Sequence, residues 1–141
     1  MAHWQPLKKD VLDSLADEIL QNYSTGRIAV DGDSTSGYAA FADGLADALR
    51  GKGTTVTRAD ESEPHANSGP LDTDLQVVAG EQLQWPARAG QWRFTVWVEG
   101  FGDDSFATQT YLRQVNPRAR ASAIIDNRDP EHPRQQFGDS C

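Results

Sequence analysis

The segment from Arg27 to Arg58 constrains the fold more than any other part of this sequence. It begins with a short apolar run, Arg27 to Asp31, which lies between two glycines and is typical of a buried strand. A turn bounded by Gly32 and Gly37 follows, and apolar residues then recur three to four positions apart from Tyr38 to Arg50, which predicts a helix. Residues 54–58 are again typical of a strand. Strand, turn, helix and strand in this order predict a βαβ unit with a parallel pair of strands.

The rest of the sequence extends this unit to a three-layer domain. Residue spacing predicts further helices over residues 6–22 and 105–115, and further strands over residues 75–79, 94–98 and 123–126. Five strands alternating with helices indicate an α/β fold with a mostly parallel five-stranded sheet. A length of 141 residues fits a single domain over residues 1–141. Within it we distinguish an N-terminal helical segment (1–25), an acidic loop (60–74) and a C-terminal tail (128–141).

Charge and cysteine content exclude several classes of protein. The formal net charge is −8 and the isoelectric point is about 4.7, so the chain repels nucleic-acid phosphates and anionic membrane surfaces. The one cysteine, Cys141, rules out an intramolecular disulfide framework and a zinc site built on cysteines. The three histidines lack the spacing of metal ligands, so we expect no metal site. Because no apolar stretch approaches 18 residues, we expect a cytoplasmic protein.

The turn between the first strand and the second helix has the glycine spacing of the phosphate-binding loop G-x-x-x-x-G-K-[ST]. Its residues are Gly32, Asp33, Ser34, Thr35, Ser36, Gly37 and Tyr38. Tyr38 stands where the motif has the lysine that neutralises phosphate, and Ala39 stands where it has the hydroxyl that holds Mg²⁺. Backbone N–H groups at the start of a helix still favour an anion, and the three hydroxyls of the turn add donors, whereas Asp33 opposes an anion.

Four other stretches carry a resemblance to a known family. They are residues 27–32 (RIAVDG), 41–49 (FADGLADAL), 116–121 (NPRARA) and 124–130 (IIDNRDP). In these stretches the chain is similar to uridine kinases of the phosphoribulokinase-like P-loop family. The resemblance implies a P-loop NTPase-like fold and an ancestral reaction that used ATP and Mg²⁺.

The resemblance also implies which residues would form a nucleotide site. The turn after the last strand would lie near the adenine, and its residues are Asn127, Asp129 and Pro130. Asp60 matches the acidic catalytic base that follows the second strand in the family. Ala79 stands where the third strand carries an acid before a glycine. The nucleoside-contacting region is shortened, and only residues 99–104 remain where an arginine-bearing lid would fold over ATP.

These losses favour a protein that does not transfer phosphoryl groups. Charge-assisted hydrogen bonds contribute about 1.5–3 kcal/mol each, so loss of the lysine alone weakens triphosphate binding by one to two orders of magnitude. We therefore expect a non-catalytic or repurposed protein that binds ATP and Mg²⁺ weakly at best. Its partner would be a nucleotide or a phosphorylated small molecule bound through the turn, or another protein.

Two other hypotheses remain open from the sequence. The chain could be an active nucleoside or small-molecule kinase that recruits Lys52, Arg58 or an arginine from residues 113–134, or that completes its site by dimerisation. Alternatively, acid–base chemistry unrelated to phosphoryl transfer could use carboxylates of the nucleotide site that the resemblance implies, namely Asp31, Asp60 and Glu81. Trp85 and Trp92 lie in the shortened part of the chain and predict an interface with a second copy or another protein.

Overall fold

The computed structural model describes residues 7–60 and 74–136 as a single α/β unit. Its strands are β1 (Gly26–Gly32), β2 (Val56–Asp60), β3 (Leu75–Gly80), β4 (Trp92–Glu99), β5 (Ala123–Asp126) and β6 (Arg134–Gln136). Its helices are α1 (Lys8–Asn22), α2 (Tyr38–Gly51), α3 (Pro86–Ala89), α4 (Phe106–Val115) and α5 (Pro117–Arg120). The strands form one sheet in the order β2-β3-β1-β4-β5-β6, and all neighbours are parallel except β5 and β6. The predicted α/β fold with a mostly parallel sheet is confirmed.

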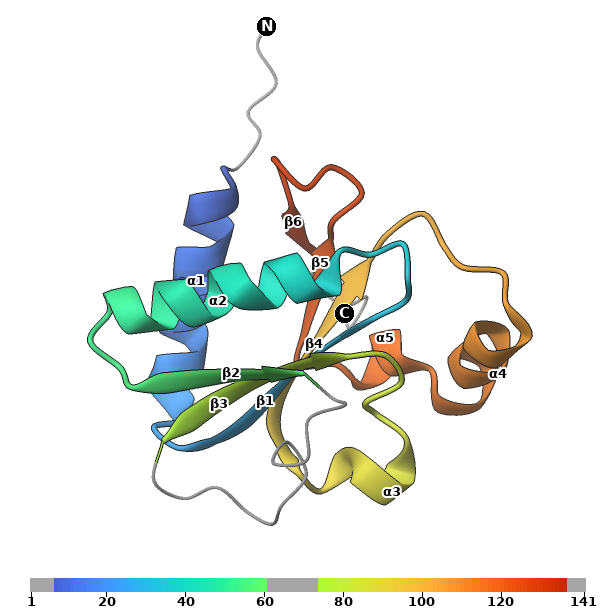
Figure 1. Ribbon diagram of the computed structural model, residues 1–141, viewed down its shortest axis with the longest axis horizontal. Coiled ribbons are helices and arrows are strands. Elements are labelled where there is room, and N and C mark those ends of the chain that lie inside the picture. The colour runs from blue at the N-terminus through green and yellow to red at the C-terminus, as the bar shows by residue number, and fades with distance from the viewer. Residues whose placement is uncertain (1–6, 61–73, 137–141) are drawn as a thin grey trace, which may run out of the picture.

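Helices cover the two faces of the sheet unequally (Figure 1). The long helices α1 and α2 lie together on one face, whereas α3, α4 and α5 lie on the other. Alternation along the strands explains this difference, because Ile28 and Val30 of β1 point into the core beneath α1 and α2. Arg27 and Asp31, which also lie in β1 but do not belong to that core, are buried as well. On the second face, charged groups are therefore buried beneath the shorter helices α3, α4 and α5.

The apolar core beneath α1 and α2 holds most of the buried side chains. Helix α1 contributes Leu15 and Ile19, and helix α2 contributes Phe41, Leu45 and Leu49, none of which is more than 1% exposed. A smaller cluster on the second face contains Trp97, Tyr111, Val115 and Ile124. Burial of these apolar side chains provides the main driving force for folding.

The structure corrects the predicted pairing of the first two strands. Strands β1 and β2 are parallel, as predicted, but β3 lies between them and pairs with both. Strand β3 occupies this position because four of its six residues, Val77 to Gly80, are buried and Leu75 is buried too. An apolar strand of this kind is stabilised in the interior of a sheet.

The structure also corrects the number of strands and the extent of the C-terminal tail. The tail predicted from residue 128 contains β6, which turns back beside β5 and places Arg134 opposite Asp126. The turn at Asp129 and Pro130 permits this reversal, since the His132 amide donates to the Asp129 carbonyl at 2.9 Å. Two short helices, α3 and α5, were not predicted. Most of the predicted acidic loop, residues 61–73, lies outside the described residues, and so do residues 1–6 and 137–141.

No helix within residues 7–60 and 74–136 is long and apolar enough to cross a lipid bilayer.

Candidate functional site

The turn between β1 and α2, residues 32–38, is shaped by its two glycines, and we call it the glycine turn. A Cβ atom on Gly32 would lie 2.8 Å from the carbonyl oxygen of Val98 and against the Ser36 side chain. Gly37 has a φ of 68° and caps the N-terminus of α2, a left-handed conformation that favours glycine. The motif spacing seen in the sequence therefore corresponds to a strand–turn–helix connection in the structure.

The Asp33 carboxylate occupies the hydrogen-bond donors of this turn. Asp33 is 9% exposed, and its Oδ1 atom accepts from the Thr35 amide at 2.8 Å and from the Thr35 hydroxyl at 2.6 Å. Its Oδ2 atom accepts from the Asp103 amide at 3.1 Å. A negative charge thus lies where backbone amides would otherwise be available to an external anion.

The hydroxyls of Ser34, Thr35 and Ser36 are also engaged within the protein. Ser34 Oγ donates to Asp103 Oδ2 at 2.9 Å, and Ser36 Oγ donates to the Asp33 carbonyl oxygen at 2.8 Å. Besides donating to Asp33, the Thr35 hydroxyl accepts from the Gly102 amide at 3.0 Å. Hydrogen bonds from the Ser105 amide and the Ser34 hydroxyl hold the pKa of Asp103 below its ordinary value.

Residues 100–104 pack directly on the turn. A Cβ atom on Gly100 would overlap the Thr35 carbonyl group, so the two backbones approach as closely as glycine allows. The hydrogen bonds from the amides of Gly102 and Asp103 to the turn add to this contact. The short segment expected to replace a lid is therefore joined to the turn.

The two side chains that replace the motif's lysine and hydroxyl offer neither a cation nor a metal ligand. Tyr38 is half-buried and packs against the core beneath α1 and α2. Ala39 is exposed, and its carbonyl oxygen lies 3.4 Å from Nη2 of Arg58. The described residues contain no group of three or more metal-ligating side chains that could hold an ion.

Asn127 joins the end of β5 to the turn. Its Nδ2 atom donates to the Ser36 carbonyl oxygen at 2.8 Å, and its own amide donates to the Glu99 carbonyl at 2.8 Å. The Asn127 side chain is 6% exposed, and its Oδ1 atom is buried without a hydrogen-bond partner in the described part of the chain. The residue that was predicted to contact a base thus brings its own turn and the glycine turn together.

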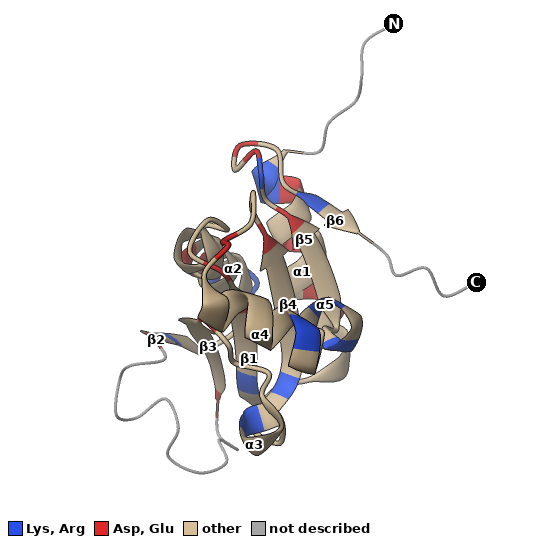
Figure 2. Cartoon of the chain, turned by 90° about the vertical axis from the view of Figure 1, so that its right-hand side faces the viewer, with Lys and Arg blue, Asp and Glu red and all other residues tan. Residues whose placement is uncertain are grey.

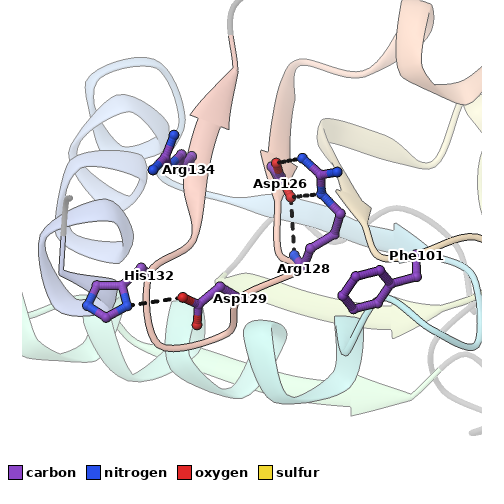
Figure 3. Close-up of a pocket in the computed structure, with 6 residues that line it drawn as sticks. All are labelled: Phe101, Asp126, Arg128, Asp129, His132 and Arg134. Carbon is purple, nitrogen blue, oxygen red and sulfur yellow. Dashed lines mark hydrogen bonds and ion pairs between the residues drawn. The ribbon is translucent and has the colours of Figure 1, made fainter. Parts of the chain in front are cut away.

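A pocket of about 440 Å³ opens beside this junction (Figure 3). Its lining residues are Phe101, Asp126, Arg128, Asp129, His132 and Arg134. Arg128 forms two hydrogen bonds to the Asp126 carboxylate, at 3.0 and 2.7 Å, and thereby lowers the pKa of Asp126. His132 Nδ1 lies 3.3 Å from Asp129 Oδ2. Pro130 is exposed in the same turn.

Asp60 lies at the end of β2, away from the glycine turn. Because β3 separates β2 from β1, the ends of these strands are about 10 Å apart. Asp60 Oδ1 forms a 2.9 Å ion pair with Nη1 of Arg58. Arg58 Nη2 also donates to the Ala39 carbonyl oxygen at 3.4 Å, so this arginine links Asp60 to the start of α2.

A buried polar network beneath the second face was not predicted from the sequence. Asp31 is completely buried, and this burial raises its pKa to about 6. The Tyr111 hydroxyl donates to Asp31 Oδ2 and accepts from the Gln84 amide at 2.9 Å. Asp31 Oδ1 is buried without a hydrogen-bond partner among the described residues. Full burial shields the Asp31 carboxyl group from solvent.

Comparisons with known proteins identify the fold. No family model matches the sequence, and no curated protein matches it. The structure is similar to that of a possible uridine kinase from Bacillus stearothermophilus, with a TM-score of 0.67 and 17% identity over 84% of this chain and 98% of that chain. Bacillus subtilis YdiB also matches, with a TM-score of 0.40 and 14% identity over 82% of this chain and 94% of that chain. At this level of identity the likeness concerns architecture, and the chain has a P-loop NTPase-like kinase fold.

Proposed function

We propose that this chain is a P-loop-kinase-like protein that does not transfer phosphoryl groups and that binds a nucleotide-like ligand weakly through the planar ring of that ligand. The observation that carries the proposal is the Asp33 carboxylate, which the amides of Thr35 and Asp103 hold inside the turn. A phosphate entering the turn would meet this charge and compete for the same donors. Phosphoryl transfer depends on positioning and neutralising the phosphates, so this turn lacks the chemical means for it.

Two of the cations that could replace the missing lysine, Arg58 and Lys52, form ion pairs with other residues. Arg58 pairs with Asp43 at 3.0 Å and with Asp60 at 2.9 Å. Lys52 pairs with Asp17 at 2.9 Å and follows the last residue of α2, a helix of 14 residues that spans about 20 Å. A lysine at that end of the helix is too far from the turn to reach a phosphate bound there. These placements favour the non-transferring protein over a kinase that recruits Arg58 or Lys52.

The pocket beside the turn offers surfaces that suit a planar ring. The Phe101 side chain is 79% exposed and lines this pocket. Arg134 lines it too, and its guanidinium forms no hydrogen bond or ion pair with the described residues. Aromatic and guanidinium planes both stack on heteroaromatic rings. We place the base of the ligand in this pocket, next to the turn after β5 that contains Asn127, Asp129 and Pro130.

A comparison of adenosine with ATP tests the proposal. Titration calorimetry and amide chemical shifts should give millimolar dissociation constants for both ligands, with ATP no tighter than adenosine and no dependence on Mg²⁺. We expect neither ATP hydrolysis nor transfer to uridine. Micromolar, Mg²⁺-dependent ATP binding would contradict the proposal, and turnover that disappears in Arg58→Gln would establish the recruited-cation kinase instead. If ATP and adenosine both fail to bind, the ring site is wrong and only the absence of transfer stands.

Restoring the motif separates the effect of Asp33 from that of the missing side chains. The double variant Tyr38→Lys, Ala39→Thr supplies both missing groups, yet we expect little gain in ATP affinity while Asp33 remains. Adding Asp33→Ser should then raise the affinity at least about tenfold, since it removes the charge and releases two amides. Adding Asp104→Ser to the same double variant is the matched control, because Asp104 is exposed and lies outside the turn.

Binding of a protein partner through Trp85 and Trp92 stays a prediction. Both indoles are half-buried, with Trp85 packed at 5.4 Å from the ring of Tyr111 and Trp92 Nε1 donating to the Leu83 carbonyl at 2.7 Å. Sedimentation of the purified chain tests whether a second copy covers them.

A further inference from the structure

A second pocket lies at the end of the strands opposite to the glycine turn. It has a volume of about 250 Å³ and is lined at the start of β4 by Trp92, Arg93 and Thr95, and before β5 by Arg120 and Ser122. Strands β1 and β4 are parallel, so the start of β4 and the end of β1 lie at opposite ends of the sheet. We call this site the arginine pocket.

The arginine pocket carries positive charge that no lining carboxylate offsets. Two arginines line it, and none of its described lining residues is acidic. The pocket beside the turn differs, because Asp126 and Asp129 balance its cations. Figure 2 looks onto this side of the molecule and shows Lys and Arg segments gathered over α3, α5 and the adjoining strands, with Asp and Glu segments mostly toward β5 and α2. In a chain with a net charge of −8, this is a local excess of cations.

Both arginines are exposed, and their guanidinium groups retain unused donors. Arg93 forms no hydrogen bond or ion pair with the described residues, and its aliphatic stem packs against Gly26, where a Cβ atom would overlap it. Arg120 Nε donates to the Val115 carbonyl at 2.8 Å, and its terminal nitrogens have no partner in the described part of the chain. Guanidinium donors bind carboxylate and phosphate oxygens in a fixed geometry.

Hydroxyl and aromatic groups complete the lining. Ser122 Oγ accepts from the Thr95 amide at 3.1 Å, and Thr95 Oγ1 accepts from the Ser122 amide at 3.0 Å. The two hydroxyl oxygens lie 3.4 Å apart, so at most one of their protons is shared between them and the other can be donated to a ligand. Trp92 adds apolar surface, and its hydrogen bond to Leu83 fixes the indole.

We propose that the arginine pocket binds a small organic anion, a phosphate or carboxylate carried on a flat ring. The anionic group would lie between Arg93 and Arg120 and accept a hydroxyl proton from Thr95 or Ser122. The ring would pack against Trp92. This ligand is separate from the one placed beside the glycine turn, and the pocket's volume of about 250 Å³ admits one small molecule.

The test uses phenyl phosphate, benzoate and inorganic phosphate as probes of the full chain. Amide chemical shifts should move at Arg93 and Ser122, and calorimetry should give a dissociation constant of about 1 mM or tighter for phenyl phosphate or benzoate at low salt. Whichever of phenyl phosphate and benzoate binds more tightly shows whether the pocket prefers a phosphate or a carboxylate. Inorganic phosphate should bind more weakly because it lacks the ring. Affinity should fall as salt is added, since screening weakens the interaction with the arginines.

Matched variants decide whether the arginines form the site. Arg93→Gln and Arg120→Gln should each weaken binding by about tenfold or more, since each removes charge-assisted hydrogen bonds. Arg113→Gln is the control, because Arg113 is an exposed arginine of α4 that lines neither of the two pockets. Thermal unfolding checks that each variant is folded. Shifts confined to Gly37 or Arg134, equal affinity in Arg93→Gln and Arg113→Gln, or no binding of any probe would each overturn the proposal.

Discussion

The glycine turn and the arginine pocket have opposite relations between shape and charge. The turn has the glycine spacing of an anion-binding loop, but the Asp33 carboxylate takes its donors. The arginine pocket has no recognisable motif, yet Arg93 and Arg120 line it without an acidic neighbour. Because binding of an anion requires donors that are not already used, the side chains around a loop decide its chemistry more than the spacing of its glycines.

The largest effect is expected at Asp31, which lies between these two regions. Burial raises the folded-state pKa of Asp31 to about 6 from its ordinary value of 3.8, so the folded protein binds a proton more tightly than the unfolded chain. The resulting stabilisation is present below pH 3.8 and is lost as pH rises through about 6. From pH 4 to pH 7, the free energy of unfolding of Asp31→Asn should therefore gain about 2.4 kcal/mol relative to the parent chain.

Urea unfolding of both chains across this pH range measures the difference. Asp10→Asn, which replaces an exposed carboxylate on α1, is the matched control and should show no such gain. A constant difference between Asp31→Asn and the parent chain would mean that Asp31 titrates as it does in the unfolded state.

The second effect concerns the contact between residues 100–104 and the turn. Gly100→Ala places a methyl group on the Thr35 carbonyl and should destabilise the protein by about 1–3 kcal/mol, because the two backbones must separate. Gly90→Ala is a suitable control, since a Cβ atom there has no neighbour within 4 Å. Thermal unfolding of the two variants measures the difference. Equal melting temperatures would show that the loop can move away from the turn at little cost.

The third effect tests whether the turn is a concealed anion site. Asp33→Ala leaves the amides of Thr35 and Asp103 without their acceptor and should cost about 1–2 kcal/mol. Sulfate should restore part of this stability in Asp33→Ala and not in the parent chain, as measured by unfolding at constant ionic strength in sulfate and chloride. Equal sulfate responses would remove the contrast between the turn and the arginine pocket.

The smallest effect is expected at the Asp126–Arg128 pair. The Arg128 side chain is 59% exposed, so water screens the pair, and Arg128→Ala should change the free energy of unfolding by less than about 1 kcal/mol. Chemical denaturation measures this change. The same variant should leave phenyl phosphate binding unchanged, because Arg128 lies in the other pocket. A larger loss of stability would indicate that the turn after β5 depends on this pair.

The local sequence pattern predicted individual helices and strands better than it predicted which strands lie side by side in the sheet. The β1–turn–α2 unit follows from adjacent residues, and the structure places it within one or two residues of the predicted bounds. The position of β3 between β1 and β2 depends on burial across the whole sheet and does not appear in the spacing of either strand. The same holds for β6, whose pairing with β5 depends on a turn between them.

The candidate site was predictable in composition and not in its hydrogen bonds. The absence of lysine and hydroxyl at Tyr38 and Ala39 can be seen in the sequence. The function of Asp33 cannot, because one of its partners, Asp103, is 70 residues away. Tyr111 is 80 residues from Asp31, and its place in a predicted helix does not reveal this contact. The charged residues Arg27 and Asp31 at the two ends of a strand predicted to be buried were the local sign of a buried polar network.

The close approach of Gly100 to Thr35 limits what point mutation can achieve in this protein. The six residues from Gly100 to Ser105 span at most about 20 Å when extended, and part of that length is already used in contact with the turn. Exchanging side chains leaves this tether in place. A longer loop that could open and close over the turn would therefore require inserted residues between β4 and α4, because no exchange of side chains lengthens this connection.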